Sequence, residues 1–314
     1  MTPSAQRQRD LKLPASDVTT ATREARKPLL HGKAQWRRYQ PTPAGSQAAD
    51  MCTQLWDAID PCGRGDASGL ALHYQPIVDL TQGATWGYEA LLRWTPPGGE
   101  PVPAAQLIDA AERTGLILPL GDWVIRKAIT DAATFACGPD GRQPYVSVNV
   151  SPVQLCQPDL ADTVAAVLAA TGVQPDRVII ELIETQPVAA DGHDAWQALH
   201  RLCDLGVHLA VDDYGTGNAV LGHLQQSIVN IVKLDRSFTS DLSESRNRAL
   251  IRAVVGLAED LGIDLIVEGI EDEPTRHALI DLGCSRGQGY LFGHPMPLAE
   301  ATGHSPQRTI LTER

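Results

Sequence analysis

Acidic side chains recur at the ends of short apolar segments of this sequence. Glu89, Glu181 and Glu268 each lie within or directly after a run that is rich in aliphatic residues, which predicts a strand. A carboxylate is costly to bury there unless it is paired or bound to a metal. The polar residues in such positions are Glu89, Asn149, Glu181, Asp212, Asp213, Lys233, Asp235 and Glu268. This set predicts one shared site.

The residue types indicate which chemistry the site would perform. Oxygen ligands without histidine or cysteine favour Mg²⁺ or Mn²⁺ over zinc or copper. The adjacent pair Asp212 and Asp213 can serve two ions, and two ions about 3.5–4 Å apart suit in-line cleavage of a phosphoester. Lys233 would then offset charge on the phosphorane or orient the attacking water. The alternative, that each carboxylate caps a helix or pairs with an arginine, is reasonable for one residue and poor for the whole set.

Apolar runs that predict strands alternate with longer segments of helical period from residue 70 onward. The predicted strands are 72–78, 85–92, 145–150, 178–182, 207–211, 231–234, 264–267 and 289–292. The predicted helices are 103–136, 152–170, 190–205, 218–226, 246–261 and 273–282. Ser151 and Pro152 suit the start of a helix, while Gly206, Gly262 and Gly283 suit helix ends.

Eight strands with intervening helices predict an α/β fold, an irregular TIM-like (β/α) barrel. Only a few residues around Gln82 separate the first two strands, too few for a helical crossover, so this pair is predicted to be an antiparallel hairpin. The carboxyl ends of the remaining strands converge on one face of such a barrel, where active sites lie. The fold would therefore gather the polar set.

Composition divides the chain into a basic beginning and an acidic body. Residues 1–50 carry nine Lys/Arg and four Asp/Glu, and the remainder carries 17 and 34, so the charges are near +5 and −17. Residues 1–66 lack an apolar period and are predicted to be a largely disordered extension. Within it, Leu29–Tyr39 could form a short helix that binds a protein partner or a surface, or could be a solvated tail. The predicted barrel spans 67–302, and 303–314 is a tail.

Several functional classes fit the sequence poorly. A body this acidic disfavours nucleic-acid binding, and we find neither a long apolar segment nor a secretory signal pattern. The cysteines are scattered without the spacing of a zinc site or a disulfide framework: Cys52, Cys62, Cys137, Cys156, Cys203 and Cys284. We therefore expect a cytoplasmic protein without a membrane span.

The ordered motifs resemble a known family. The segments 74–78 (YQPIV) and 89–94 (EALLRW) look like the opening of an EAL domain, the bacterial cyclic di-GMP phosphodiesterase. The later motifs follow in the family's order over about residues 68–302: VNVS at 148–151, ELIET at 181–185, DDYGTG at 212–217, VKLDRSF at 232–238, VEGIE at 267–271 and QGY at 288–290. Each motif alone is weak, but the ordered set is specific.

The resemblance implies an irregular barrel with one antiparallel strand that hydrolyses cyclic di-GMP to linear pGpG. By position, the metal ligands would be Glu89, Asn149, Glu181, Asp212 and Asp213. Lys233 and Glu268 would position or deprotonate the lytic water. Glu89 would be a catalytic residue as well as a metal ligand. The substrate contacts would be Gln75, Leu91, Arg93, Asp235 and Gln288, and the loop-supporting residues Glu184 and Glu271. The family also implies two Mg²⁺ or Mn²⁺ ions and a homodimer.

Two segments depart from the family's pattern. Ile183 and Thr185 stand where threonine and serine are usual, and Asn218-Ala219-Val220 replaces an aromatic residue and two serines. In the family this loop couples the dimer to metal binding, so rate, coupling or metal affinity could differ here. Two alternatives stay open: a cyclic di-GMP receptor with weak catalysis, and an enzyme for another cyclic dinucleotide or for pGpG.

Overall fold

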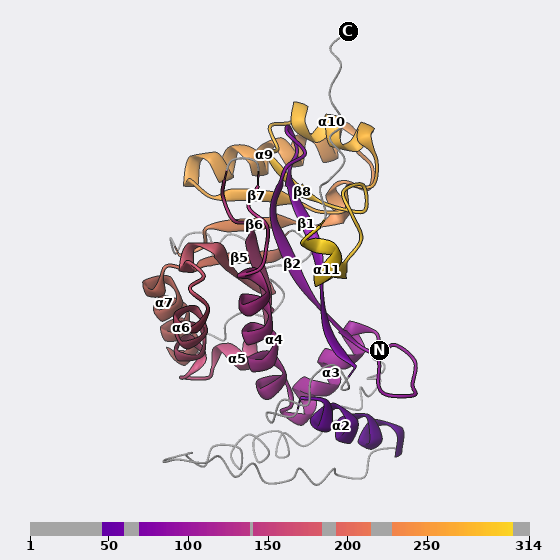
Figure 1. Ribbon diagram of the computed structural model, residues 1–314. Coiled ribbons are helices and arrows are strands. Elements are labelled where there is room, and N and C mark those ends of the chain that lie inside the picture. Colours follow the sequence, from indigo (N-terminus) through magenta and orange to yellow (C-terminus); the bar gives the residue numbers. More distant parts are fainter. Residues whose placement is uncertain (1–45, 60–68, 139–140, 184–192, 215–227, 304–314) are drawn as a thin grey trace, which may run out of the picture. The chain divides into compact units, whose positions relative to one another are not determined.

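The computed structural model describes residues 46–59, 69–138, 141–183, 193–214 and 228–303 (Figure 1). They belong to a compact unit that begins at Gly45, whereas the unit Met1–Ala44 lies outside the described residues. Residues 1–45 and 60–66 of the predicted 1–66 extension, the predicted helix at 218–226 and Glu184 also lie outside them, whereas residues 46–58 of that extension form a helix. No helix among the described residues is long and apolar enough to cross a bilayer.

Eight strands close into a barrel, as the sequence predicts. The sheet order β2-β3-β4-β5-β6-β7-β8-β1 closes because β1 also pairs with β2, and the short β9 (Met296–Pro297) pairs with β1. The strands are β1 (Leu70–Asp79), β2 (Thr85–Trp94), β3 (Tyr145–Val150), β4 (Val178–Ile183), β5 (His208–Tyr214), β6 (Ile231–Leu234), β7 (Asp264–Val267) and β8 (Arg286–Gln288).

Strand β1 is antiparallel to both of its barrel neighbours. It pairs with β2 from Leu70↔Trp94 onward and with β8 at Ile77↔Gln288. The other adjacent pairs, from β2–β3 to β7–β8, are parallel. The predicted antiparallel hairpin is therefore confirmed, and the carboxyl ends of seven strands face the same way.

A buried apolar layer fills the middle of the barrel. It consists of Ile77, Ala210, Ile179, Ile231 and Ile266. Side chains two residues apart lie on the same face of a strand. Ile179, Ile231 and Ile266 each lie two residues before a predicted site residue on the same strand or directly after it. The polar set is consequently held at one end of the barrel, above a buried apolar layer.

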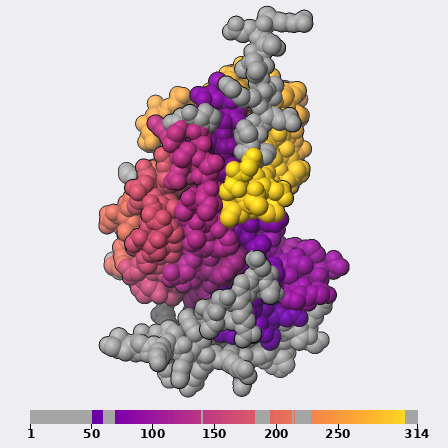
Figure 2. Space-filling model, viewed as in Figure 1, coloured from indigo at the N-terminus to yellow at the C-terminus, as the bar shows by residue number. Residues whose placement is uncertain are grey.

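Most of the helices cover the outside of the barrel, whereas the first two pack at the Leu70–Trp94 end of the β1–β2 hairpin (Figure 1). The helices are α2 (Ser46–Ala58), α3 (Ala104–Thr114), α4 (Ile117–Ala132), α5 (Pro152–Leu155), α6 (Leu160–Thr171), α7 (His193–Leu205), α9 (Ser245–Leu261), α10 (Glu273–Asp281) and α11 (Leu298–Ala301). Cys52 and Leu55 of α2 pack in one buried cluster with Trp94 and Leu107. Tyr88 donates to the Ala301 carbonyl at 2.9 Å, which ties α11, yellow in Figure 2, to β2.

Three predicted elements need correction. The eighth strand is 286–288 and not 289–292, because residues 289–292 form a turn in which Phe292 donates to the Gly289 carbonyl. The predicted helix 103–136 is two helices, since Gly115 adopts a left-handed φ of 76° at the end of α3. The predicted helix 152–170 is likewise split into α5 and α6. Ser151 caps α5 as predicted.

The described cysteines do not form disulfides with one another. Cys52, Cys137, Cys156, Cys203 and Cys284 are free thiols. Burial raises the pKa of the Cys284 thiol to about 12, so this thiol is unreactive at neutral pH.

Candidate active site

Lys233 lies at the centre of a ring of carboxylates. Its Nζ is 2.8 Å from Glu268 Oε1, 3.1 Å from Glu181 Oε2, 3.1 Å from Asp212 Oδ1 and 3.3 Å from Glu89 Oε2. The lysine is 1% exposed and Glu181 is 0% exposed. One buried cation therefore faces four acidic groups from four different strand ends.

Two amide side chains hold Glu89 in place. Asn149 Nδ2 donates to Glu89 Oε1 at 2.9 Å, and Gln288 Nε2 donates to Glu89 Oε2 at 2.7 Å. The same Gln288 nitrogen is 3.0 Å from Gln75 Oε1, and Gln75 and Glu89 are register partners across β1 and β2. Because Asn149 donates through nitrogen, its amide oxygen is the atom left for a cation.

Glu181 is held from below by a serine. Ser147 Oγ donates to Glu181 Oε1, and Ser147 is 1% exposed. The sequence analysis missed Ser147, because a serine within a strand carries no charge that would mark it. Its alternation with Asn149 on β3 is the signal that could have found it.

The backbone at Glu268 is fixed by a close approach to the segment after β6. Gly269 has a φ of +71°, and a Cβ there would lie 2.4 Å from the Arg236 Cβ. Thr239 Oγ1 is 2.9 Å from the Arg236 carbonyl and 3.1 Å from the Glu268 carbonyl. Thr239 thus helps to fix the position of the Glu268 backbone. The sequence analysis also missed this residue.

Burial and mutual charge shift the ionisation of the site. Burial raises the pKa of Glu181 well above its ordinary value, and the charges of Glu89 and Asp212 add to this although Lys233 opposes it. Burial likewise raises the pKa of Glu268 to about 7 against the effect of Lys233. Burial opposes ionisation of Glu89 too, but Lys233 and the amide hydrogen bonds bring its pKa below the ordinary value.

The same charges act on the lysine in the opposite sense. Burial alone would lower the pKa of Lys233, but Glu181, Glu89, Glu268 and Asp212 together raise it well above its ordinary value. The lysine is therefore an ammonium at neutral pH. Its single charge leaves the ring of four carboxylates with an excess of negative charge.

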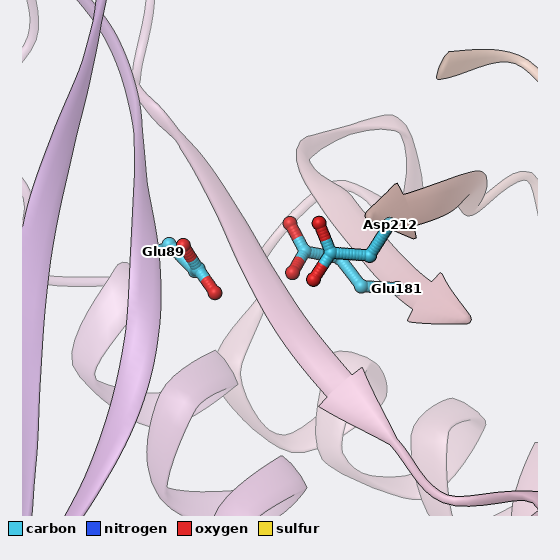
Figure 3. A group of neighbouring side chains, drawn as sticks. All are labelled: Glu89, Glu181 and Asp212. Atoms are coloured by element: carbon cyan, nitrogen blue, oxygen red, sulfur yellow. The ribbon is translucent and has the colours of Figure 1, made fainter. Parts of the chain in front are cut away.

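The arrangement fits divalent cations. Ligand atoms of Glu89, Glu181 and Asp212 all lie within 4.8 Å of one another, and Figure 3 shows the three carboxylates turned toward a common region. Asp212 Oδ1 is buried without a hydrogen-bond partner, although it lies within ion-pair distance of Lys233. One lysine has three N–H groups and cannot donate to four carboxylates at once, so this oxygen can still accept a cation. Hard cations prefer such oxygen donors.

The remaining predicted residues lie at or around this end of the barrel. Leu91 and Arg93 follow Glu89 at alternate positions of β2, and both are half-buried. The Arg93 guanidinium donates to the Leu92 carbonyl at 2.9 Å and forms no ion pair with a described carboxylate. Asp235 caps the short 3-10 helix 236–238 by accepting from Ser237 N at 2.9 Å.

Two other predicted positions are only partly described. Asp213 belongs to β5, but its side chain lies outside the described residues. Glu271 is exposed and follows Ile270 at the end of the segment after β7. Neither the second-metal role of Asp213 nor the loop-supporting role of Glu184 and Glu271 is therefore tested by the structure.

Comparisons with known proteins agree with this geometry. Residues 64–295 match the model of the EAL domain family. The chain is 37% identical over 265 residues to cyclic di-GMP phosphodiesterase PA2567 of Pseudomonas aeruginosa, covering 83% of this chain and 44% of that protein. It is 34% identical over 271 residues to the bifunctional diguanylate cyclase/cyclic di-GMP phosphodiesterase MucR of the same organism, covering 86% and 39%.

Solved structures share the fold. The complex of the PaMucR phosphodiesterase with c-di-GMP has a TM-score of 0.70 and 32% identity, over 81% of this chain and 99% of that one. The EAL enzyme Bd1971 bound to cAMP and cyclic-di-GMP has a TM-score of 0.72 and 29% identity, over 82% and 68%. The chain spans less than half the length of the curated relatives named above. It belongs to the EAL domain family.

Proposed function

We propose that this protein is a divalent-metal-dependent phosphodiesterase that hydrolyses cyclic di-GMP to linear pGpG. The observation that carries the proposal is the ring of Glu89, Glu181, Asp212 and Glu268 around Lys233, at the carboxyl ends of the barrel strands of an EAL domain. The names of the relatives support the substrate, since PA2567 and MucR are cyclic di-GMP phosphodiesterases.

The cation ligands in this proposal are Glu89, Asn149, Glu181, Asp212 and Asp213. Glu89 and Asn149 are already joined by a hydrogen bond of 2.9 Å, so the two ligands are oriented before a cation arrives. Two Mg²⁺ or Mn²⁺ ions would supply positive charge that activates water and neutralises the phosphate. A bound cation would also favour the ionised form of Glu181, which burial disfavours.

Glu268 and Lys233 handle the proton and the developing charge. Glu268, whose pKa is raised to about 7, accepts the proton of the attacking water as its oxygen bonds to phosphorus. The Lys233 ammonium stays protonated and stabilises the negative charge that builds up on the phosphoryl oxygens. The bond from phosphorus to the 3′ oxygen of one ribose then breaks and that oxygen takes up a proton from solvent, which gives pGpG with a 5′-phosphate and a free 3′-hydroxyl.

Substrate binding uses side chains around this centre. The Arg93 guanidinium can bind a phosphate through two of its N–H groups. Gln75 and Gln288 are buried beside Glu89, and the Gln288 amide oxygen has no described partner, so it is available to substrate or to a cation. Leu91 and Asp235 complete the contacts that we propose.

The direct test is hydrolysis of cyclic di-GMP by the purified protein with Mg²⁺ or Mn²⁺, with pGpG followed by chromatography. The wild type should form pGpG only with metal, and Glu89→Ala should form none, because one ligand and the anchor for Asn149 and Gln288 are lost. Tight binding of cyclic di-GMP without product would contradict the proposal and indicate a receptor. Product from a different cyclic dinucleotide alone would contradict the substrate assignment.

A further inference from the structure

One polar residue interrupts the apolar layer beneath the site. Ser147 pairs in register with Ile179, at the level of the barrel that is otherwise filled by residues such as Ala210 and Ile231. It is 1% exposed. A hydroxyl is costly to bury in such a layer unless it forms a hydrogen bond, so its partner indicates what the residue does.

That partner is a carboxylate of the ring above. Among the described residues, the Ser147 hydroxyl donates to Glu181 Oε1. The second oxygen, Oε2, is 3.1 Å from Lys233 Nζ, which Glu89 Oε2 and Asp212 Oδ1 also contact. The two oxygens of Glu181 therefore have different partners. Oε1 accepts from Ser147 below the site, and Oε2 contacts Lys233 at its centre.

We propose that Ser147 is a positioning residue that fixes Glu181 so that a single oxygen, Oε2, is presented to the cation. This inference rests on the proposed metal site. Residues that orient a metal ligand in this way set its rotamer and its basicity, and their loss usually weakens metal binding by about 10–100-fold. The serine contacts neither the cation nor the substrate.

The test is Mn²⁺ binding by calorimetry, with the full chain and without substrate. Ser147→Ala should raise the Kd for Mn²⁺ by about 10-fold or more. The matched control is Ser151→Ala, another buried serine of the same segment, whose hydroxyl accepts from Gln154 N and caps α5. The control should lose some thermal stability and keep its Mn²⁺ Kd within about twofold, so a merely structural loss is separated from a positioning loss.

A second measurement tests whether the effect passes through Glu181. The fall in Tm that Ser147→Ala causes in metal-free protein should be several degrees when Glu181 is present and about 1 °C or less in a Glu181→Ala background. If Ser147→Ala unfolds the protein only while Glu181 is present, the contact is equally supported. Equal effects in both backgrounds would overturn the proposal.

The outcomes separate this inference from the proposed function. If wild type binds Mn²⁺ and Ser147→Ala binds it equally well, the positioning role is wrong and the metal site stands. If Ser147→Ala and Ser151→Ala weaken Mn²⁺ binding alike, the positioning role is again wrong. If wild type does not bind Mn²⁺, both the metal-dependent function and the role of Ser147 fail.

Discussion

The two ends of the barrel are both polar, but their charges are arranged differently. At the carboxyl ends of the strands, four carboxylates surround Lys233. At the amino ends, Trp86 stacks on Tyr145 with ring centroids 4.2 Å apart, and the guanidinium of Arg286 lies 4.7 Å from the Trp86 ring. Arg286 also pairs with Asp264. The amino end is thus balanced, whereas the carboxyl end has an excess of negative charge.

This difference distinguishes a structural closure from a binding site. Stacked rings and paired arginines satisfy one another, so they close the barrel without needing a ligand. An acidic ring in which Asp212 Oδ1 is buried and accepts no hydrogen bond has more carboxylates than Lys233 can neutralise, so protons or further cations would stabilise it. The apolar layer that contains Ile179 and Ile231 separates the two ends, so each can be perturbed independently.

The largest effect should come from removing the central cation. Lys233→Met keeps the apolar stem and should lower kcat/KM for cyclic di-GMP by about 10³-fold, since the variant lacks the charge that we propose to stabilise the phosphoryl oxygens. The control is Lys127→Met, which removes a lysine paired with Asp131 at 2.6 Å on α4 and should leave kcat/KM within about twofold. Equal losses of kcat/KM in both variants would show that Lys233 has no special role in the reaction.

The closure at the amino end should contribute to stability alone. Trp86→Ala removes the stack on Tyr145 and should lower the free energy of unfolding by about 2–3 kcal/mol. Urea unfolding measures this change, and kcat/KM well below Tm should stay within about twofold of wild type. A large loss of activity without loss of stability would show that this end communicates with the site.

The acidic ring should make the metal-free protein sensitive to pH. Glu268 binds its proton more tightly when folded, with a pKa of about 7, so its protonated form favours folding. That contribution is fully present below about pH 4 and falls as pH rises through 7, and the raised pKa of Glu181 acts in the same direction. With a chelator present, stability should therefore fall by about 1–3 kcal/mol from pH 5 to pH 8. Thermal unfolding of Glu268→Gln should show a shallower slope, and a stability that rises with pH would refute the assignment.

The smallest effect should come from changing the shape of one cation at the closed end. Arg286→Lys keeps the positive charge beside Asp264 but loses the flat face over Trp86, so stability should fall by less than about 1 kcal/mol. Urea unfolding again measures it, beside Arg113→Lys on an exposed part of α3, which should have no effect. A loss equal to that of Trp86→Ala would mean that the arginine, and not the stack of rings, holds this end.

The sequence predicted the strands best where apolar residues follow one another without glycine. The bounds of β3, β6 and β7 agree with the prediction. Strand β8 was misplaced, because Arg286-Gly287-Gln288 has no apolar pattern while the following turn does. Gly287 is needed there for packing, since a Cβ would lie 2.4 Å from Ile270 Cδ1. Such close approaches depend on distant residues and cannot be read from local pattern.

The site was predictable as a set of charged residues but not as a network. Strand ends marked Glu89, Glu181, Asp212 and Glu268, because buried carboxylates are unusual. Their common contact with Lys233 depends on barrel closure, which brings β2 and β6 together across the interior. Ser147 and Thr239 went unnoticed, because uncharged hydroxyls on strands and turns are common and only their partners reveal what they do.

The reversed direction of β1 decides where the chain enters the barrel. Because Leu70 pairs with Trp94 at the carboxyl end of β2, the chain arrives at the face that carries the acidic ring, whereas a first strand parallel to the others would begin on the opposite face. Helix α2, just upstream, packs in the cluster that contains Trp94 and Leu107. A movement of α2 would therefore act first on the Leu70–Trp94 end of the β1–β2 hairpin, at the end of the barrel that carries the acidic ring.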